Sequence, residues 1–234
     1  MRTATHAEAM DRIYRTQRRF YDLTRKYYLF GRDRLIDGLD LKPGATLAEI
    51  GCGTARNLIA IAHRHPGARL FGLDASSEML KTAEGALRRA GLSDRVVLAQ
   101  GYAEAMTRHT FGNELNHVVF SYSLSMIPDW QGALMAAAGS LAPGGLVHVV
   151  DFGDLKGLPG PAQGLLRAWL RKFQVVPRDL LLKSLEDGRS PPSRRLQLLP
   201  GRYSFIASAG LDDPILLPRQ VVAGQSQAHG NPAN

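Results

Sequence analysis

The stretch Leu47–Asn57 reads L-A-E-I-G-C-G-T-A-R-N, and it decides the fold that we expect of this chain. An apolar strand over 45–50 runs into Gly51-Cys52-Gly53, and a helix opens over 54–57. Glycines at such a turn let the backbone bend tightly and approach a ligand closely, because no Cβ is in the way. Free N–H groups at the start of the helix face the same ligand. The stretch therefore indicates a strand–turn–helix unit that binds a small molecule.

The spacing of the residues around this turn narrows the class of ligand. A second strand, 69–73, ends in Asp74 about 20 residues after Gly53, the distance at which a doubly wound sheet places a carboxylate against ribose hydroxyls. A dinucleotide fingerprint needs a third glycine at position 56, where this chain has Arg56. A Walker loop needs G-K-[ST], which the sequence lacks. The pattern favours a ribose-containing ligand other than a dinucleotide or a nucleoside triphosphate.

The acid before the turn completes a recognisable motif. Glu49, the G-C-G-T run, Asn57 and the strand-end Asp74 together resemble motif I of class I S-adenosylmethionine-dependent methyltransferases. The alternative is a glycine turn in an arbitrary α/β protein. The resemblance implies that S-adenosylmethionine is the cofactor. The cofactor-binding residues that it implies are Glu49, Gly51, Cys52, Gly53, Asn57, Asp74, Ala75, Met79, Gly101, Tyr102, Ala103, Ser121 and Ser123.

The chain departs from this motif pattern in two places. The third glycine of the family is Ala55 here, and alanine is small and suits the start of a helix. After the third strand the family pattern is G-D-A, in which the aspartate faces the adenine amine, whereas this chain has Gly101-Tyr102-Ala103. Tyr102 is therefore expected either to stack on adenine or simply to pack.

The alternation of strand and helix patterns predicts an α/β fold. We expect a doubly wound, mostly parallel, Rossmann-like sheet of about seven strands with an antiparallel C-terminal edge and an N-terminal helical lid. Expected domains are the lid over 1–42, the cofactor-binding domain over 43–211 and a disordered tail over 212–234. The expected helices span 6–28, 32–39, 56–64, 76–89, 130–141, 164–173 and 177–186, and the expected strands 45–50, 70–73, 96–99, 117–122, 146–152, 195–199 and 202–207.

Composition excludes several other classes. The chain has 234 residues, which suits a domain with a sizeable core. No apolar stretch approaches a membrane span, and the N-terminus lacks the apolar core of a secretory signal. Cys52 is the only cysteine, so no internal disulfide forms, which fits a reducing cytoplasm. The histidines show no spacing typical of a metal site, and no metal is expected.

The net charge of +8 is unevenly distributed. Basic residues gather over 12–34 and 156–202, while the central region is nearly balanced. Such flanks indicate an anionic partner, either a nucleic acid or an acidic membrane surface, although a basic solvated surface is the plainer alternative. No N/D-P-P-Y/W tetrapeptide follows the fourth strand, so we expect no nucleic acid.

Four further segments, 21–35, 121–130, 148–153 and 165–170, resemble a branch of these methyltransferases. The branch comprises bacterial N-methyltransferases of lipid head groups, above all diacylglycerylhomoserine N-methyltransferases of betaine-lipid synthesis, with phosphatidylethanolamine N-methyltransferases as relatives. The resemblance implies a cytoplasmic enzyme, peripheral to the inner face of the membrane, whose substrate is a lipid amine. A small-molecule or RNA methyltransferase of the same fold and a binding protein without catalysis remain alternatives, and the oligomeric state is open.

The residues expected to handle the acceptor follow from the chemistry of methyl transfer. The transfer needs a neutral amine aimed at the methyl carbon, which desolvation and orientation provide. Aromatic faces suit the cationic product, and the alternative for each tyrosine is a packing role alone. Arg25 is expected to pair with a carboxylate. The predicted catalytic residues are Tyr21, Tyr28 and Tyr122, and the predicted substrate-binding residues are Asp22, Arg25, Tyr27 and Arg32.

The amphipathic stretch 164–173 is the candidate membrane contact. Trp169 fits an interfacial anchor, and Arg167 and Arg171 on the polar side suit anionic lipid. The alternative is that this helix packs on the sheet with its arginines in water.

Overall fold

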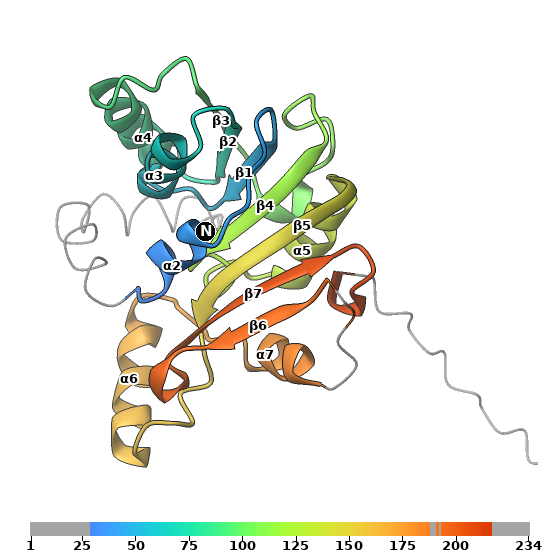
Figure 1. The fold of residues 1–234 in the computed structure, drawn as a ribbon. Coiled ribbons are helices and arrows are strands. Elements are labelled where there is room, and N and C mark those ends of the chain that lie inside the picture. The colour runs from blue at the N-terminus through green and yellow to red at the C-terminus, as the bar shows by residue number, and fades with distance from the viewer. Residues whose placement is uncertain (1–28, 188–190, 192, 217–234) are drawn as a thin grey trace, which may run out of the picture.

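The computed structural model of the chain describes residues 29–187, 191 and 193–216 (Figure 1). They form a seven-stranded sheet in the order β3-β2-β1-β4-β5-β7-β6. Strands β1 to β5 are parallel, and β7 runs antiparallel to β5 and β6, which confirms the expected mixed sheet with an antiparallel edge. The strands are β1 Thr46–Ile50, β2 Arg69–Asp74, β3 Val96–Gln100, β4 Leu115–Ser121, β5 Leu141–Phe152, β6 Arg195–Leu198 and β7 Ser204–Gly210.

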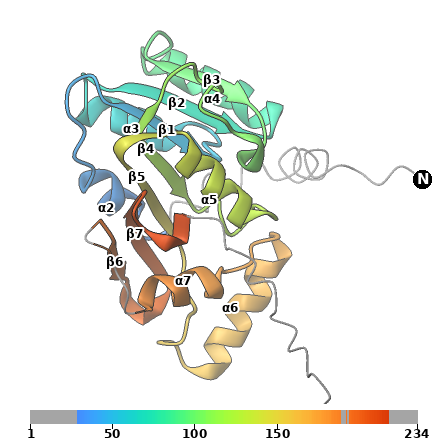
Figure 2. The same ribbon diagram turned by 90° about the vertical axis from the view of Figure 1, so that its right-hand side faces the viewer.

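Helices cover both faces of the sheet, as a doubly wound fold requires. Residues of α2, α3 and α4 share one hydrophobic core with one face, and residues of α5 and α7 share a second core with the other face. Figure 2 shows α5 and α7 lying together on their face of the sheet. The helices are α2 Arg32–Asp37, α3 Arg56–Arg64, α4 Ser77–Arg89, α5 Trp130–Gly139, α6 Gly160–Lys172 and α7 Asp179–Glu186, with short 3-10 turns η1 Ala103–Ala105, η2 Pro200–Arg202 and η3 Pro214–Leu216.

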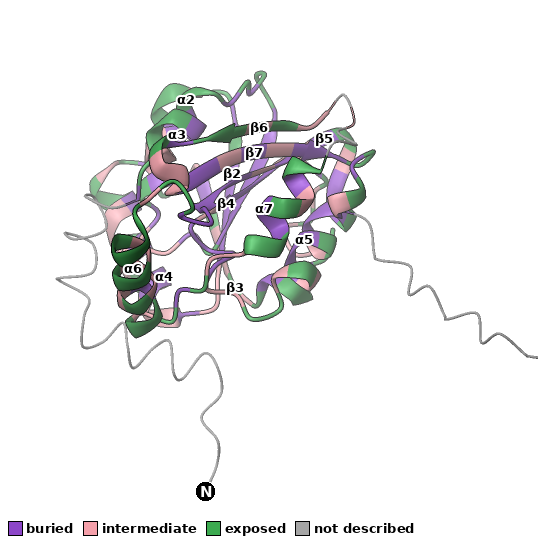
Figure 3. Ribbon diagram, turned by 90° about the horizontal axis from the view of Figure 1, so that it is seen from below, coloured by how far each residue is buried: buried purple, intermediate pink, exposed green. Residues whose placement is uncertain are grey.

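The central strand β1 is buried on both faces, which explains its nearly continuous apolar sequence. Side chains alternate across a strand, so Leu47 belongs to one core while Ala48 and Ile50 belong to the other. Seen from below, the central strands are mostly buried, whereas the edge strand β6 and the outer sides of the helices are exposed (Figure 3). The layers place the carboxyl ends of the parallel strands at one edge, where ligands of such sheets bind.

Several element boundaries differ from the expected ones. Strand β5 begins at Leu141 rather than at 146, because Leu141 pairs with Leu115 before the register shifts and Leu146 pairs with His117. The Pro-Gly-Gly run lies in that irregularity, and α5 consequently ends earlier, at Gly139. Helix α6 begins at Gly160 rather than at 164, with proline in its first turn, where the missing N–H is tolerated.

The domain extends beyond its expected end at residue 211. The first part of the predicted tail forms η3, with Leu216 buried in the core. Asp213 is fully buried and makes an ion pair with Arg194, whose side chain is also buried. A buried charge that is paired in this way holds its segment against the domain. Residues 217–234 of the predicted tail and residues 1–28 of the predicted lid lie outside the described residues.

Candidate active site

The glycine loop after β1 has the strained conformation that its sequence indicates. Gly51, Gly53 and Ala55 have φ angles of 73°, 55° and 62°, in the left-handed region. A Cβ on Gly51 would lie 2.6 Å from the Cβ of Ser123, so only glycine fits there. A Cβ on Gly53 would meet nothing within 4 Å. Ala55, at the position of the family's third glycine, adopts the left-handed conformation itself, which costs roughly 1–2 kcal/mol for an alanine.

Asp74 ties this loop to the end of β2. Its Oδ2 atom accepts a hydrogen bond from the Gly53 amide at 2.8 Å, and its Oδ1 atom accepts one from the Ser76 amide at 2.9 Å. A carboxylate offers about four acceptor positions, so it can hold two loops and bind a diol at once. The structure thus places the Asp74 carboxylate between the glycine loop and the start of α4.

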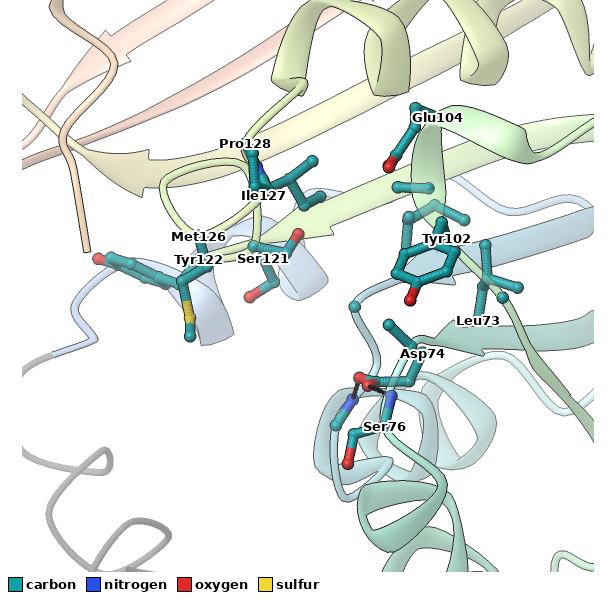
Figure 4. A pocket seen from close by; sticks show the side chains of 17 residues that line it. Leu73, Asp74, Ser76, Tyr102, Glu104, Ser121, Tyr122, Met126, Ile127 and Pro128 are labelled. Atoms are coloured by element: carbon teal, nitrogen blue, oxygen red, sulfur yellow. Dashed lines mark hydrogen bonds between the residues drawn. The ribbon is translucent and has the colours of Figure 1, made fainter. Parts of the chain in front are cut away.

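A cavity of about 730 Å³, including the space open to solvent at its mouth, lies beside these loops (Figure 4). It sits at the carboxyl ends of the parallel strands. Of the predicted site residues, the cavity is lined by Gly51, Gly53, Asp74, Ala75, Gly101, Tyr102, Ala103, Ser121, Tyr122 and Ser123. The lining residues that the sequence did not suggest are Ile50, Leu73, Ser76, Glu104, Met126, Ile127 and Pro128. Their position directly before or after predicted site residues is the signal that could have found most of them.

Glu49 and Asn57 lie behind the glycine loop rather than on the cavity wall. Glu49 is 2% exposed, and its Oε1 atom accepts a hydrogen bond from Asn57 Nδ2 at 2.6 Å. Burial raises the pKa of Glu49 to about 7, against the lowering effects of the Asn57 bond and of Arg32. Its Oε2 atom is buried and has no hydrogen-bond partner within the described ranges. This carboxyl group supports the loop and has unused acceptor capacity.

Cys52 and Met79 are core residues whose side chains do not line the cavity. A Cβ on Gly72 would lie 2.8 Å from Cys52 Sγ, so the thiol fills space inside the domain. Burial raises the pKa of the Cys52 thiol well above its usual value, which opposes a nucleophilic role. Met79 is 2% exposed, and its amide donates to the Ser76 hydroxyl that caps α4. Both residues lie in segments next to the cavity, but their side chains do not line it as the sequence predicted.

Buried hydroxyl groups without partners lie beside the cavity. The Oγ atoms of Ser121 and Ser123 are buried and make no hydrogen bond with any described residue. Both residues line the cavity at the end of β4. Buried polar groups in folded proteins are almost always paired, so these hydroxyls indicate that a polar ligand belongs here.

The wall segment 121–128 is held from outside the cavity by two charged residues that the sequence did not suggest. The Asp151 carboxylate accepts a hydrogen bond from the Ser125 amide at 2.9 Å, and burial raises its pKa to about 6. Arg178 donates to the carbonyl oxygens of Leu124 at 2.9 Å and Ile127 at 2.6 Å. The position of Asp151 near the end of β5 is a sequence signal for it, whereas nothing in the sequence marks Arg178.

Tyr122, predicted as catalytic, is a buried residue that anchors the segment before α2. Its hydroxyl donates to the Phe30 carbonyl oxygen at 2.5 Å, and its ring meets Phe152 edge-on at 4.8 Å. In Figure 4 its ring points away from Tyr102 and Asp74. Burial raises the pKa of its phenol above the usual range. Its part in an aromatic cage stays a prediction, and Tyr21, Asp22, Arg25, Tyr27 and Tyr28 lie outside the described residues.

Arg32, predicted to bind substrate, begins α2 and is half-buried. It lines a second hollow together with Phe30 and Tyr203, whose rings meet edge-on at 5.4 Å. Its positive charge lowers the pKa of Glu49, so its field reaches the glycine loop. The structure does not place Arg32 on the wall of the cavity beside the glycine loop.

Helix α6 carries the residues predicted to contact a membrane. Arg167 donates to the Asp154 carbonyl oxygen at 2.7 Å and pairs with Asp179 at 3.1 Å, so it connects α6 to α7. Trp169 packs with Phe173, at 4.9 Å between ring centroids, against the buried core. The packed Trp169 and the exposed Arg171 match the packing alternative, whereas Arg167 is engaged within the domain. None of the helices within the described ranges has the length and apolar character needed to cross a bilayer.

Comparison with known proteins agrees with this site. Residues 47–145 match the methyltransferase domain family. A demethylmenaquinone methyltransferase of Desulfitobacterium hafniense is 28% identical over 163 residues, 67% of this chain and 62% of the relative. One of Corynebacterium efficiens is 32% identical over 137 residues, 56% of this chain and 54% of the relative. The chain thus spans between half and two thirds of the length of these curated relatives.

Solved structures share the fold. The S-adenosylmethionine-dependent methyltransferase SibL in its apo form superposes with a TM-score of 0.59 at 21% identity, over 82% of this chain and 57% of that one. At this level of identity the likeness concerns the fold, and it agrees with the strand order and the glycine loop described above. The described residues therefore have the fold of class I methyltransferases, and the match of residues 47–145 to a methyltransferase domain fits S-adenosylmethionine as the cofactor.

Proposed function

We propose that the protein transfers a methyl group from S-adenosylmethionine to a small organic acceptor whose own ionisation supplies the nucleophile. The observation that carries this proposal is the cavity at the carboxyl ends of the strands. There the Gly51–Gly53 loop, Asp74 and the hydroxyls of Ser121 and Ser123, which bond to no described residue, line one space. Two relatives that bear the name demethylmenaquinone methyltransferase support a small-molecule acceptor.

The residues present fit the cofactor. Open space at Gly53 leaves room for a ligand against the loop, and Asp74 is placed to accept hydrogen bonds from ribose hydroxyls. The buried Oε2 atom of Glu49 has no hydrogen-bond partner among the described residues, and the ionised carboxylate would provide negative charge beneath the loop for the α-ammonium group of the ligand. When bound, the cofactor supplies an electrophilic methyl group on a sulfonium.

The cavity offers few side chains that can take a proton. Its ionisable lining residues are Asp74, Tyr102, Glu104 and Tyr122. Asp74 already holds two amides, and the buried Tyr122 phenol is engaged with a carbonyl oxygen. An acceptor with an acidic hydroxyl group suits such a site, because it reaches its reactive form without a strong protein base.

A quinol ring is an acceptor of this kind. Loss of a hydroxyl proton to water makes the neighbouring ring carbon nucleophilic. That carbon attacks the methyl group, the bond between sulfur and methyl breaks, and the ring carbon then releases its proton to water. The contribution of the domain is orientation and exclusion of water, which together account for much of the rate enhancement in such transfers.

A lipid head-group amine is the second candidate acceptor. The observation in its favour is the surface of α6, where Leu165 is 75% exposed on the same helix as the exposed Arg171 and Lys172. An exposed apolar residue beside cations suits an anionic lipid surface. The contacts of Arg167 and Trp169 within the domain weaken this candidate.

An acceptor panel with labelled S-adenosylmethionine distinguishes the two candidates. The panel contains a short-tailed naphthohydroquinone kept reduced with dithionite, diacylglycerylhomoserine and phosphatidylethanolamine in detergent micelles, and transfer RNA. We expect label in the naphthohydroquinone, none in its oxidised quinone, and none with Gly53→Ala protein. Label in an aminolipid alone would replace the quinol proposal with the second candidate, and label in RNA alone would contradict both.

A further inference from the structure

We propose that Glu104 recognises the adenine amino group of the cofactor, with Tyr102 providing the face on which the base stacks. The inference rests on the proposed function, because the ligand is S-adenosylmethionine, but not on the identity of the methyl acceptor. It concerns the end of the cavity next to η1, where the aspartate of the related motif is replaced by Tyr102.

The direction of the ligand in the cavity follows from three fixed points. The Gly53 amide of the glycine loop bonds to Asp74, and in Figure 4 Tyr102 and Glu104 lie on the side of Asp74 that faces away from Ser76. We assign the ribose to Asp74, and the sulfonium must face the methyl acceptor. The adenine base then occupies the remaining end of the cavity, beside Tyr102. That end has apolar walls from Leu73 and Ile127, which suit a flat ring.

Glu104 is the acid at this end of the cavity. It is the second residue of η1, directly after the loop that follows β3. Within the described ranges, no residue forms a hydrogen bond or an ion pair with it, unlike Glu186, whose carboxylate is occupied by Arg202. In Figure 4 the Glu104 side chain lies over the same end of the cavity as the Tyr102 ring. Its carboxylate is therefore available to a ligand.

Tyr102 is 40% exposed, which is high for an aromatic residue at the edge of a cavity. A base stacked on its ring would cover that face, and stacking on an aromatic ring tolerates any base. Tyr102 is therefore expected to contribute affinity without selecting the base. We assign selection of the base to Glu104, because a carboxylate accepts a hydrogen bond from the amino group of adenine and repels the carbonyl oxygen of hypoxanthine.

The test compares S-adenosylhomocysteine with S-inosylhomocysteine, in which the 6-amino group of the base is replaced by a carbonyl oxygen and N1 carries a proton. Calorimetry is performed with the full-length wild-type protein and with Glu104→Gln, Tyr102→Ala and Glu84→Gln. Glu84 is an exposed glutamate of α4 that does not line the cavity and serves as the matched control. Circular dichroism and thermal unfolding confirm that each variant is folded.

We expect the wild type to bind the adenine ligand about 30-fold or more tightly than the hypoxanthine ligand. The Glu104 carboxylate accepts a hydrogen bond from the amino group of adenine and repels the carbonyl oxygen of hypoxanthine. Glu104→Gln should reduce the preference to within about threefold, because an amide can both donate and accept. Tyr102→Ala should weaken both ligands by similar factors, and Glu84→Gln should behave as wild type.

An unchanged preference in Glu104→Gln would overturn the proposal. A preference lost in Tyr102→Ala but kept in Glu104→Gln would transfer the recognition to Tyr102 and would also overturn it. Absence of binding of either ligand to the wild type would contradict the cofactor assignment itself. A negative acceptor panel with normal ligand preference would contradict only the proposed acceptor, so the two failures are distinguishable.

Discussion

The Oδ2 atom of Asp74 accepts a hydrogen bond from the Gly53 amide at 2.8 Å, so the end of β2 and the loop after β1 share one carboxylate. The second oxygen of the same carboxylate holds the Ser76 amide at the start of α4. Three segments of the cofactor cavity thus depend on one side chain, and its removal affects both the shape of the cavity and its affinity.

Asp74→Asn is expected to weaken binding of S-adenosylhomocysteine by roughly 30-fold, or about 2 kcal/mol, the usual contribution of a charged hydrogen bond. An asparagine keeps one acceptor oxygen but loses the charge and the second acceptor. Calorimetry measures the change. Asp37→Asn, on the exposed end of α2, is the control, and an affinity in Asp74→Asn equal to that of the control would remove Asp74 from the ribose site.

Gly53→Ala is expected to abolish measurable cofactor binding while leaving the domain folded. The new Cβ would meet no protein atom within 4 Å and would project into the space of the ligand. A left-handed alanine costs roughly 1–2 kcal/mol, and Ala55 in the same loop already adopts that conformation. Urea unfolding and calorimetry on the same preparation separate the two effects.

Gly51→Ala, in the same loop, is expected to destabilise the domain more than Gly53→Ala does. Its Cβ would lie 2.6 Å from the Cβ of Ser123, so overpacking adds to the backbone strain and the free energy of unfolding falls by roughly 2–4 kcal/mol. Equal stability of the two variants would show that the loop and the end of β4 are farther apart than described.

Cofactor affinity is expected to fall in acid because of Glu49. Burial raises the pKa of this carboxyl group to about 7, so it is mostly ionised at pH 8 and mostly protonated at pH 6. If the ionised form attracts the α-ammonium group of the ligand, the affinity for S-adenosylhomocysteine drops roughly tenfold from pH 8 to pH 6. Glu49→Gln should bind more weakly at pH 8 and should lose this pH dependence. An equally steep dependence in Glu49→Gln would assign the titration to another group.

A second pH effect concerns stability and arises from His148. The Nδ1 atom of His117 on β4 and the Nε2 atom of His148 on β5 are 3.0 Å apart, and burial lowers the pKa of His148 to about 3. Below pH 6.5, His148 is protonated in the unfolded chain but stays neutral in the folded chain. The contribution of His148 to stability is therefore lost as the pH falls from about 6.5 toward 3.

We therefore compare the wild type with His148→Gln, which cannot titrate. The difference in their free energies of unfolding should shift by about 1 kcal/mol in favour of the variant when the pH is lowered from 7.5 to 5.5. Glu49 and Asp151, whose pKa values are raised, act in the opposite direction in both proteins and cancel in the difference. Urea unfolding at the two pH values measures it, and a constant difference would show that His148 titrates normally in the folded chain.

The sequence by itself determined the features that depend on local backbone chemistry. The left-handed turn at Gly51 and Gly53, the acid at the end of β2 and the alternation of strands and helices all follow from residue types at short spacings. These features were enough to predict the sheet, and the resemblance to a methyltransferase motif added the cofactor and most of the cavity lining. Ala55 shows the limit of such reasoning, since its helix-compatible size did not reveal that it adopts the conformation of a glycine.

Only the tertiary structure decided which side chains near the motif face the ligand. Cys52 and Met79 lie beside motif positions in sequence, yet packing turns their side chains into the core. Arg178 holds the cavity wall through carbonyl oxygens of residues more than 50 positions away, and Tyr122 bonds a carbonyl 92 positions away. Every residue has a backbone carbonyl acceptor, so no pattern of residue types predicts which carbonyl a distant side chain will bond. The direction of a side chain is set by the long-range packing around it, which only the folded chain specifies.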